Sequence, residues 1–368
     1  MTINTGTTIS KLEQPRRWKI KTQSRRSTFI SFERITQAGT NQYTIPAWLP
    51  WIVKRIVSSL LGIIVISMLV FAATQALPSD PARVILGPEA TEDAVEVFRK
   101  HLGMDQPITT QYVKWISRAL QGDWGHSIDS NIPVTQLIAG RLENSLALVA
   151  SVLIVIIPGS LFLGVFLALR RDSWIDRTCV SAMIALKAIP SFAIAIGLMM
   201  LLATSVFPVL PAVSLLDPNQ SAFAQPIFMI LPALTLVIAT LPYLTRLVRG
   251  SMIEVLDSEF ITSARLRGLK HRTIIWQYAI PNAVIPAIQA IALTTSVMIG
   301  GVLIVEVVFT YPGIGSALNS AVDIRDIPVI QAIVVFLAGS VMLINLLADI
   351  ATVMLTPRLR TQPASTGA

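Results

Sequence analysis

The stretch Leu146–Leu169, LALVASVLIVIIPGSLFLGVFLAL, carries no charged side chain and is long enough to cross a lipid bilayer as one helix. The hydrocarbon core is about 30 Å thick, so a spanning helix needs roughly 20 apolar residues. Prolines inside such runs, here Pro158 and in another run Pro190, predict kinks. The chain contains five more runs, and the six together predict an all-α polytopic membrane protein with six transmembrane helices. The other predicted spans are Ile56–Leu77, Val180–Phe207, Phe228–Val248, Ala283–Val308 and Val329–Leu355.

The composition of the whole chain excludes the soluble globular class. Its 368 residues are 53% hydrophobic and only 14% charged, with a mean hydropathy of +0.66. The single cysteine, Cys179, excludes an intrachain disulfide framework, and three scattered histidines leave no cluster for a zinc site. No catalytic, cofactor or metal site is therefore predicted in this chain.

The positive charges indicate the topology. With the N-terminus inside, 21 of the 29 Lys and Arg residues fall in cytoplasmic segments and seven fall outside, while Lys187 lies within the third span. Cytoplasmic segments retain Lys and Arg, so both termini are predicted to be cytoplasmic. The net charge of +8 is thus spread by topology and does not form the single basic patch that nucleic-acid binding needs. Residues 1–50 are predicted to be a basic, flexible cytoplasmic arm that contacts anionic lipid headgroups or docks on a partner, and residues 361–368 a short tail.

Residues 78–141 form a predicted extracytoplasmic insert between the first two spans. Thr91 can cap a helix with Glu92 and Asp93 in its first turn, and Ile108–Leu120 has the spacing of a second amphipathic helix. Two interpretations stay open: a small cap that meets a delivered partner, or a pair of helices packed on the membrane surface.

The predicted cytoplasmic loop 249–282 has the pattern of a compact helical element. Ser258 can cap a helix that places Glu259 in its first turn and Phe260, Ile261 and Ala264 on one face. Gly268 can end that helix in the left-handed conformation. A second helix from Thr273, interrupted near Pro281, is expected to follow. Such an element is suited to transmitting a displacement, so we interpret it as a docking site.

Three ionisable residues lie in or at the edges of the predicted spans: Lys187, Glu306 and Asp349. A charge at the bilayer centre costs roughly 2.5 to 3.5 kcal/mol on insertion scales, so Lys187 should snorkel to the cytoplasmic interface, pair, or face a pathway that admits acidic substrate groups. Glu306 is expected to order the outer end of the fifth span. Asp349 is expected to hydrogen-bond between helices together with Asn345.

The stretch SARLRGLKHRTIIWQYAIPNAVIP, residues 263–286, resembles the signature of the membrane subunits of ATP-binding-cassette importers. That signature reads Glu-Ala-Ala, three residues, Gly, nine residues, then Ile-x-Leu-Pro. Here Thr262, Ser263 and Ala264 occupy its first positions, with Thr-Ser replacing Glu-Ala, and Gly268 its glycine. Its end falls on Ile280 and Pro281, which follow Tyr278. Further strings in order resemble the first permease of dipeptide, oligopeptide and nickel importers over about 300 of the 368 residues: SDPARVILGP, LGMDQP, LQGDWGHSI, RLENSLALV, IPSFAIAIGL, LPALTL, RLVRGSMIEVL, VEVVFTYPGIG and DIPVIQAIVVF.

The resemblance implies that residues 51–360 form a type I importer transmembrane domain in the inner membrane of a prokaryote. It implies a second homologous permease subunit, two ATPase subunits docked on the 259–281 loop, and an extracytoplasmic solute-binding protein. ATP and Mg²⁺ would bind those ATPases, because this chain has no G-x-x-x-x-G-K-[ST] phosphate loop and is not itself the enzyme. Peptides are the substrate that the resemblance favours. Nickel chelates or other small polar solutes remain alternatives.

Other classes of membrane protein fit the sequence less well. A secondary transporter would need an intramembrane ion site, whereas the spans offer only Glu306 and Asp349 near their ends. An intramembrane protease would need a histidine within a span, but His101, His126 and His271 all fall in predicted loops. A membrane-embedded receptor or scaffold is harder to exclude by composition, and it is the pattern of the 259–281 loop that argues against it.

Overall fold

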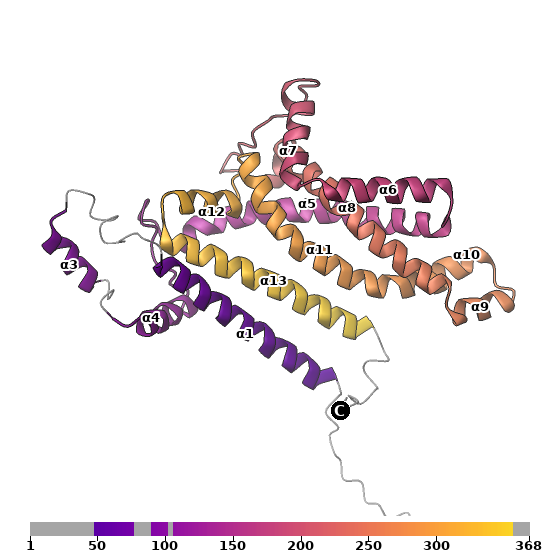
Figure 1. Ribbon diagram of the computed structural model, residues 1–368, viewed down its shortest axis with the longest axis horizontal. Helices are drawn as coiled ribbons and strands as arrows, with labels where there is room; N and C mark the ends of the chain where they lie inside the picture. The colour runs from indigo at the N-terminus through magenta and orange to yellow at the C-terminus, as the bar shows by residue number, and fades with distance from the viewer. Residues whose placement is uncertain (1–47, 77–89, 102–105, 356–368) are drawn as a thin grey trace, which may run out of the picture. The chain divides into compact units, whose positions relative to one another are not determined.

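The computed structural model describes residues 48–76, 90–101 and 106–355, and the predicted arm and tail lie almost wholly outside these ranges. Within the described ranges the chain is helical, and its only β-pairing is an isolated bridge between His126 and Pro133 (Figure 1). Five helices are long and apolar enough to cross a membrane, and a bent pair provides a sixth span. The long helices are α1 (Trp48–Gln75), α5 (Val134–Leu169), α8 (Pro226–Leu256), α11 (Ile280–Val308) and α13 (Ile327–Leu355).

The predicted third span is broken at Pro190. It consists of α6 (Trp174–Ala188) and α7 (Ser191–Met199), which continues into a π-helical turn, Met200–Thr204; the two parts meet at 96°. Ile189 has an extended backbone, as expected of a residue before proline. The expected kink is therefore a sharp elbow. The span also begins earlier than predicted, because the Ser173 hydroxyl caps α6 by accepting the Asp176 N–H at 3.2 Å.

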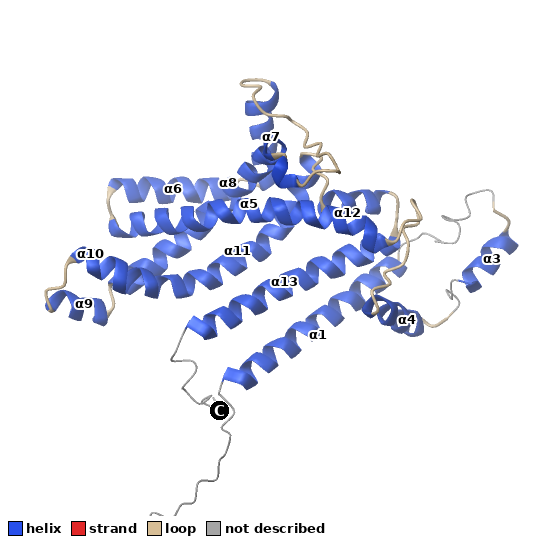
Figure 2. Cartoon of the chain, turned by 180° about the vertical axis from the view of Figure 1, so that it is seen from behind, coloured by secondary structure: helices blue, strands red, loops and turns tan. Residues whose placement is uncertain are grey.

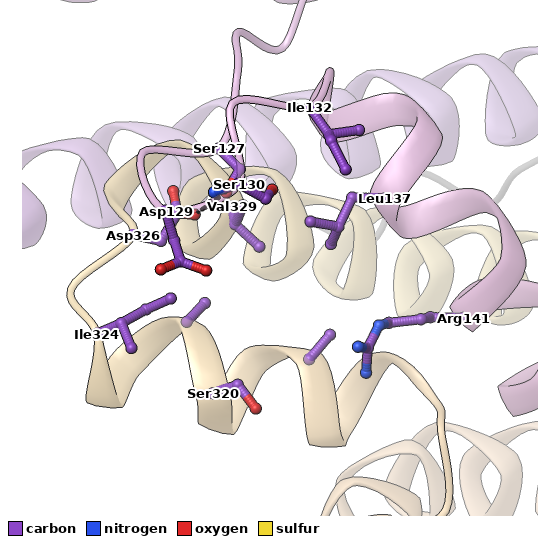
Figure 3. A pocket seen from close by; sticks show the side chains of 12 residues that line it. Ser127, Asp129, Ser130, Ile132, Leu137, Arg141, Ser320, Ile324, Asp326 and Val329 are labelled. Carbon is purple, nitrogen blue, oxygen red and sulfur yellow. Dashed lines mark hydrogen bonds between the residues drawn. The ribbon is translucent and has the colours of Figure 1, made fainter.

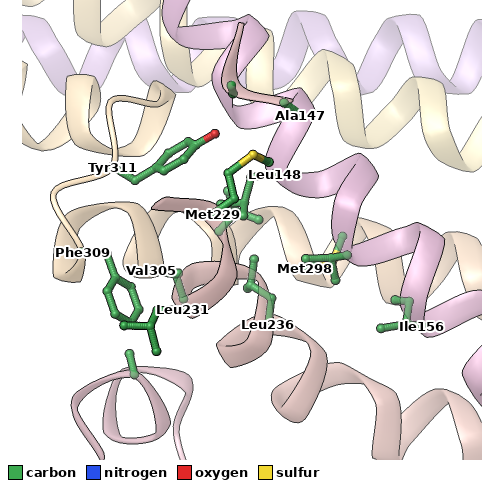
Figure 4. Packing of buried hydrophobic residues seen from close by; sticks show 14 of the residues in the cluster. Ala147, Leu148, Ile156, Met229, Leu231, Leu236, Met298, Val305, Phe309 and Tyr311 are labelled. Carbon is green, nitrogen blue, oxygen red and sulfur yellow. The ribbon is translucent and has the colours of Figure 1, made fainter. Parts of the chain in front are cut away.

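The main core lies where α5, α7, α8 and α11 meet. Leu148, Met229 and Leu236 are among its enclosed side chains (Figure 4). Gly164 permits the close approach of α5 and α8, because a Cβ there would come within 2.7 Å of a Val248 methyl carbon. These four helices are thus fixed relative to one another by steric fit.

The first and last spans, α1 and α13, lie side by side in both views (Figures 1 and 2). Gln331 of α13 donates to the buried Thr74 hydroxyl of α1 at 2.7 Å. Gly62 of α1 lies close to the side chain of Met342, since a Cβ at Gly62 would come within 2.8 Å of the Met342 methyl carbon. The opposite face of α1 is uncovered, with Val57, Leu61 and Leu69 more than half exposed. Apolar side chains at this spacing are typical of a helix face that meets lipid or another apolar helix.

The insert between the first two spans contains both predicted helices, α3 (Glu92–His101) and α4 (Ile108–Leu120). Thr91 caps α3, since its hydroxyl accepts the Ala94 N–H at 3.4 Å. The helix α4 packs on α1 through Tyr112, whose hydroxyl lies 2.7 Å from that of Ser67 and whose ring contacts Phe71. The sequence also predicts Leu102 on the apolar face of the first helix and Gly103 as its end, but both residues lie outside the described ranges.

Candidate functional site

The predicted docking element begins where α8 ends. Ser258 is extended and its carbonyl accepts the Thr262 N–H at 3.1 Å, so it occupies the N-cap position of α9 (Glu259–Leu266). Its hydroxyl does not cap the helix, however. It donates instead to the Val255 carbonyl at the end of α8, because the tight turn brings that carbonyl within reach. The helix is placed as predicted, but the predicted capping bond is wrong.

Gly268 ends α9 in the left-handed conformation, as predicted, with φ +74°. Its N–H donates to the Arg265 carbonyl at 3.0 Å, and the Leu269 N–H donates to the Ala264 carbonyl at 3.3 Å. These two bonds form the Schellman motif, which satisfies carbonyls that a helix end leaves free. No other atom lies within 4 Å of a Cβ built at Gly268, so only the backbone requires glycine here.

The inner face of α9 is anchored to the ends of two spans. Ile261 and Ala264 are buried in one hydrophobic cluster with Met252 and Leu256 of α8, Ala168 of α5, and Ile274 and Ile275, which follow α9 in the chain. Phe260 does not share this face and is 44% exposed, contrary to the prediction, because one helical step separates it from Ile261. Glu259, Thr262 and Ser263 are exposed as well. The helix α9 therefore has a buried apolar inner face and an exposed outer face that carries polar and aromatic side chains.

The chain continues from Gly268 into α11 without the predicted interruption at Pro281. A short α10 (His271–Thr273) leads into a π-helical turn, η3 (Ile274–Ala279), and Pro281 follows in the first turn of α11. Proline has no N–H and its ring clashes with the preceding helical turn, and a π-helical turn relieves both problems. Ile280 is half-buried and Pro281 is exposed. Helix from His271 to Val308 thus joins this element directly to the fifth span.

Two ion pairs that no sequence pattern predicts connect the last part of α8 to the start of α6 and to the loop before it. Arg249 binds Asp176 through two bonds of 2.7 and 2.6 Å, and the Asp176 side chain is only 3% exposed. Arg171 binds Asp257 through two bonds of 2.9 and 2.7 Å at the surface. The cap signal Ser173-x-x-Asp176 could have predicted the start of α6, but nothing local indicates the partner of Asp176.

At the other end of α11, Glu306 organises the loop that follows. The side chain is fully buried; one oxygen accepts the Ser145 hydroxyl and the other accepts the Gly315 N–H at 2.6 Å. Ser145 in turn accepts the Ile314 N–H at 2.8 Å. The carboxylate therefore holds the start of α12 (Ile314–Asp323) against α5 and α11. This placement agrees with a role in ordering the outer end of the fifth span.

Tyr311 closes the same loop over the core (Figure 4). Its hydroxyl donates to the Asn144 carbonyl at 2.8 Å, and the Asn144 amide donates to the Pro312 carbonyl at 2.9 Å. Burial, reinforced by the nearby Glu306 charge, raises the pKa of Tyr311 above its ordinary value. The phenol therefore stays a neutral donor, and the loop is fixed to α5 at both ends.

Lys187 and Asp349, the other ionisable residues predicted in the spans, belong to neither of these two sites. Lys187 is in the last turn of α6, next to the elbow at Pro190, with its Nζ 5.9 Å from the centre of the Tyr243 ring. A helix rises about 1.5 Å per residue, so Lys187 lies roughly 20 Å along α6 from its start, too far to snorkel back to that end.

Asp349 pairs with Arg55 of α1, whereas Asn345 bonds to the Val341 carbonyl of its own helix at 2.9 Å. The interhelical role predicted for Asn345 is therefore wrong. In the described ranges no three His, Cys, Asp or Glu side chains are grouped to share a metal ion.

Comparison with known proteins identifies this architecture. Residues 160–361 match the family described as binding-protein-dependent transport system inner membrane component, and residues 48–149 match the N-terminal family of such membrane components. The chain belongs to this family of ABC importer permeases. These permeases are multi-pass inner-membrane components of transport systems, distinct from the catalytic subunits.

Two similar proteins cover most of the chain. A probable peptide ABC transporter permease of Sinorhizobium fredii is 33% identical over 310 residues, which is 84% of this chain and 99% of that protein. The glutathione transport system permease of Escherichia coli K12 is 34% identical over 313 residues, 85% of this chain and 99% of that protein. The predicted resemblance to the dipeptide, oligopeptide and nickel permeases is thereby confirmed.

Proposed function

We propose that this permease forms half of the membrane pathway of an ATP-driven peptide importer and couples that pathway to ATP hydrolysis through α9. The observation that carries the coupling role is the construction of α9. Its inner face is buried in a cluster that includes residues of α5, α8 and η3, its ends are fixed by Ser258 and Gly268, and its outer face is exposed. A docked subunit that moves α9 must therefore move the spans with it.

The outer face of α9 is the proposed contact with an ATPase subunit. Glu259, Phe260, Thr262 and Ser263 are all exposed there, so they offer one charge, one aromatic anchor and two hydroxyls. Aromatic side chains with a polar surround are typical of interface anchors. On the inner side, Ala264 packs on the spans and Gly268 fixes the end of the helix; Ile280 and Pro281 start α11, which carries the displacement onward.

The distribution of Lys and Arg supports an orientation with both termini and α9 in the cytoplasm, and with the 78–141 insert and α12 outside. The partners we propose are a second homologous permease, two ATPase subunits on the cytoplasmic side and a solute-binding protein outside. ATP and Mg²⁺ would bind the ATPase subunits, since the present sequence has no phosphate loop.

Peptides are the proposed substrate class because relatives that match over the whole permease region are named for peptide and glutathione transport. No feature of the described residues favours nickel chelates or an ion-coupled mechanism. Lys187 is the residue that we expect to face the substrate pathway, because it is exposed at the elbow of the bent span and too deep to reach the interface. There it would favour acidic groups on the substrate.

Uptake in proteoliposomes tests this function. The complete complex, with a set of labelled di- and oligopeptides, should accumulate at least one peptide only when the solute-binding protein is on the outside and ATP is on the ATPase side. Uptake driven by a proton or sodium gradient without ATP would overturn the proposal in favour of a secondary transporter. Absence of uptake under every condition, from a complex that hydrolyses ATP, would overturn the peptide assignment.

A further inference from the structure

A pocket of about 260 Å³ lies between α12 and the 127–132 loop (Figure 3). Its walls come from the 127–132 loop, the start of α5, one face of α12 and the start of α13. The loop is braced on both sides. The Ser127 N–H donates to the Ile132 carbonyl at 2.9 Å, and the Asn131 N–H donates to the Ser127 carbonyl at 3.0 Å. The pocket is therefore preformed.

One end of this pocket is acidic. Asp326 is 2% exposed; one of its oxygens accepts the Ser127 hydroxyl, whereas Oδ1 is buried without any hydrogen-bond partner. Among the described residues only Thr245 has another buried side-chain atom in this condition. Asp129 is exposed on the loop and lies beside Asp326 (Figure 3). A buried carboxylate oxygen without a hydrogen-bond partner is unfavourable. Together the Asp326 and Asp129 carboxylates make the potential at this end of the pocket negative, which attracts a cation.

The opposite wall carries one positive charge, Arg141, whose guanidinium already has a hydrogen-bond partner. It donates to the Ser316 hydroxyl at 3.2 Å, on the side of α12 that faces the Glu306 site. The Ser320 hydroxyl donates to the Ser316 carbonyl at 3.0 Å and adds no charge. Two carboxylates at one end thus outweigh one guanidinium at the other, so the pocket selects a positively charged group.

We propose that this pocket receives a Lys or Arg side chain of the solute-binding protein when that protein docks on the outer face. The inference rests on the proposed function and orientation. The family is dependent on a binding protein by description, and all the pocket walls belong to segments that the Lys and Arg distribution assigns to the outside. A preformed pocket of complementary charge is suited to fixing the register of a docked protein.

The position of the pocket would also allow docking of the solute-binding protein to affect the membrane spans. It is lined by α12, which is joined to α11 through Gly315 and Glu306 and to α5 through Ile314 and Ser145. A side chain pressed into the pocket would bear on α12 and hence on both spans. Since α11 leads to the η3 turn and α9, the arrangement provides a route from docking to the ATPase side.

The affinity of the wild-type complex for the solute-binding protein that stimulates its ATPase activity provides the test. Asp129→Asn should weaken that affinity by about tenfold at low salt, and Asp129→Lys by more, because a surface charge pair is lost or reversed. The matched control is Asp323→Asn, which removes an exposed charge from the end of α12 but does not line the pocket. It should leave the affinity within about twofold of wild type.

A second readout locates the contact directly. Carbodiimide should cross-link Asp129 to a lysine of the docked solute-binding protein, and mass spectrometry should identify that pair. Unchanged affinity in both Asp129 variants, or a raised KM for peptide with unchanged protein affinity, would overturn the inference; the latter would assign the pocket to the substrate's ammonium group. If instead no solute-binding protein stimulates the wild-type complex, the proposed function itself fails.

Discussion

Gly313 lies so close to Glu306 that a Cβ on the glycine would overlap the carboxylate carbon. The same carboxylate accepts the N–H of Gly315, where a Cβ would come within 2.5 Å of the Leu303 backbone. The loop after the fifth span is therefore wrapped around a single acidic side chain, and its glycines are required by space.

Gly313→Ala should destabilise the permease by about 1 to 3 kcal/mol, because the added methyl group must displace the buried Glu306 carboxylate. The thermal unfolding midpoint of the purified complex measures this loss. The control is Gly300→Ala, since no atom lies within 4 Å of a Cβ at Gly300. Equal midpoints for the two variants would contradict the packing described for Glu306.

Ser145→Ala should cost about 1 to 3 kcal/mol, because the Ser145 hydroxyl both donates to Glu306 and accepts the Ile314 N–H. Ser151→Ala on the same helix is the control, since that hydroxyl bonds the Ala147 carbonyl of its own helix. Hydrogen exchange should increase at the start of α12 in the first variant alone. Full protection of α12 in Ser145→Ala would refute the bridging role.

Removing one member of the buried ion pair should cost far more than removing the same residue type at the surface. Arg249→Ala leaves Asp176 buried without its partner and should cost about 3 kcal/mol. Arg171→Ala should cost under about 1 kcal/mol, since both members of that pair are about half exposed. Thermal unfolding of the two variants in parallel checks the difference, and similar losses would count against it.

Gly268→Ala should loosen the end of α9, because a side chain costs about 1 kcal/mol or more in the left-handed region. ATPase subunits should co-purify less completely and ATP-driven uptake should fall. Gly250→Ala, in the interior of α8 with open space around it, should change neither measurement. Wild-type co-purification and uptake in the Gly268 variant would contradict the coupling role of α9.

The features that the sequence predicts correctly are those that depend on local pattern. Apolar length locates five spans, the 108–120 spacing locates α4, and Gly268 locates the end of α9. Prediction fails where the outcome depends on distant partners. Asp176 and Arg249 are 73 residues apart, and Ser145 and Glu306 are 161 apart, so no spacing rule connects them.

Local geometry explains the remaining errors. A proline in a hydrophobic run is compatible with a gentle kink or a sharp elbow. In the structure α6 and α7 both contact α8 and meet at 96°, an angle that no local pattern specifies. Hydrophobicity alone places Phe260 on the buried face, yet helical spacing places it outside. An exposed aromatic residue on an otherwise well-packed helix therefore indicates a functional surface, although its hydrophobicity alone would predict that it is buried.

The π-helical turn at Ile274–Ala279 rotates α11 about the helix axis relative to the residues that precede the turn. Such a turn is equivalent to one residue inserted into an α-helix, and one residue corresponds to about 100° around the helix axis. The residues before the turn and those of α11 after it are therefore offset by about that angle, compared with an uninterrupted α-helix. Deleting a single residue here would remove this extra rotation, so α11 would be turned by about 100° relative to α10.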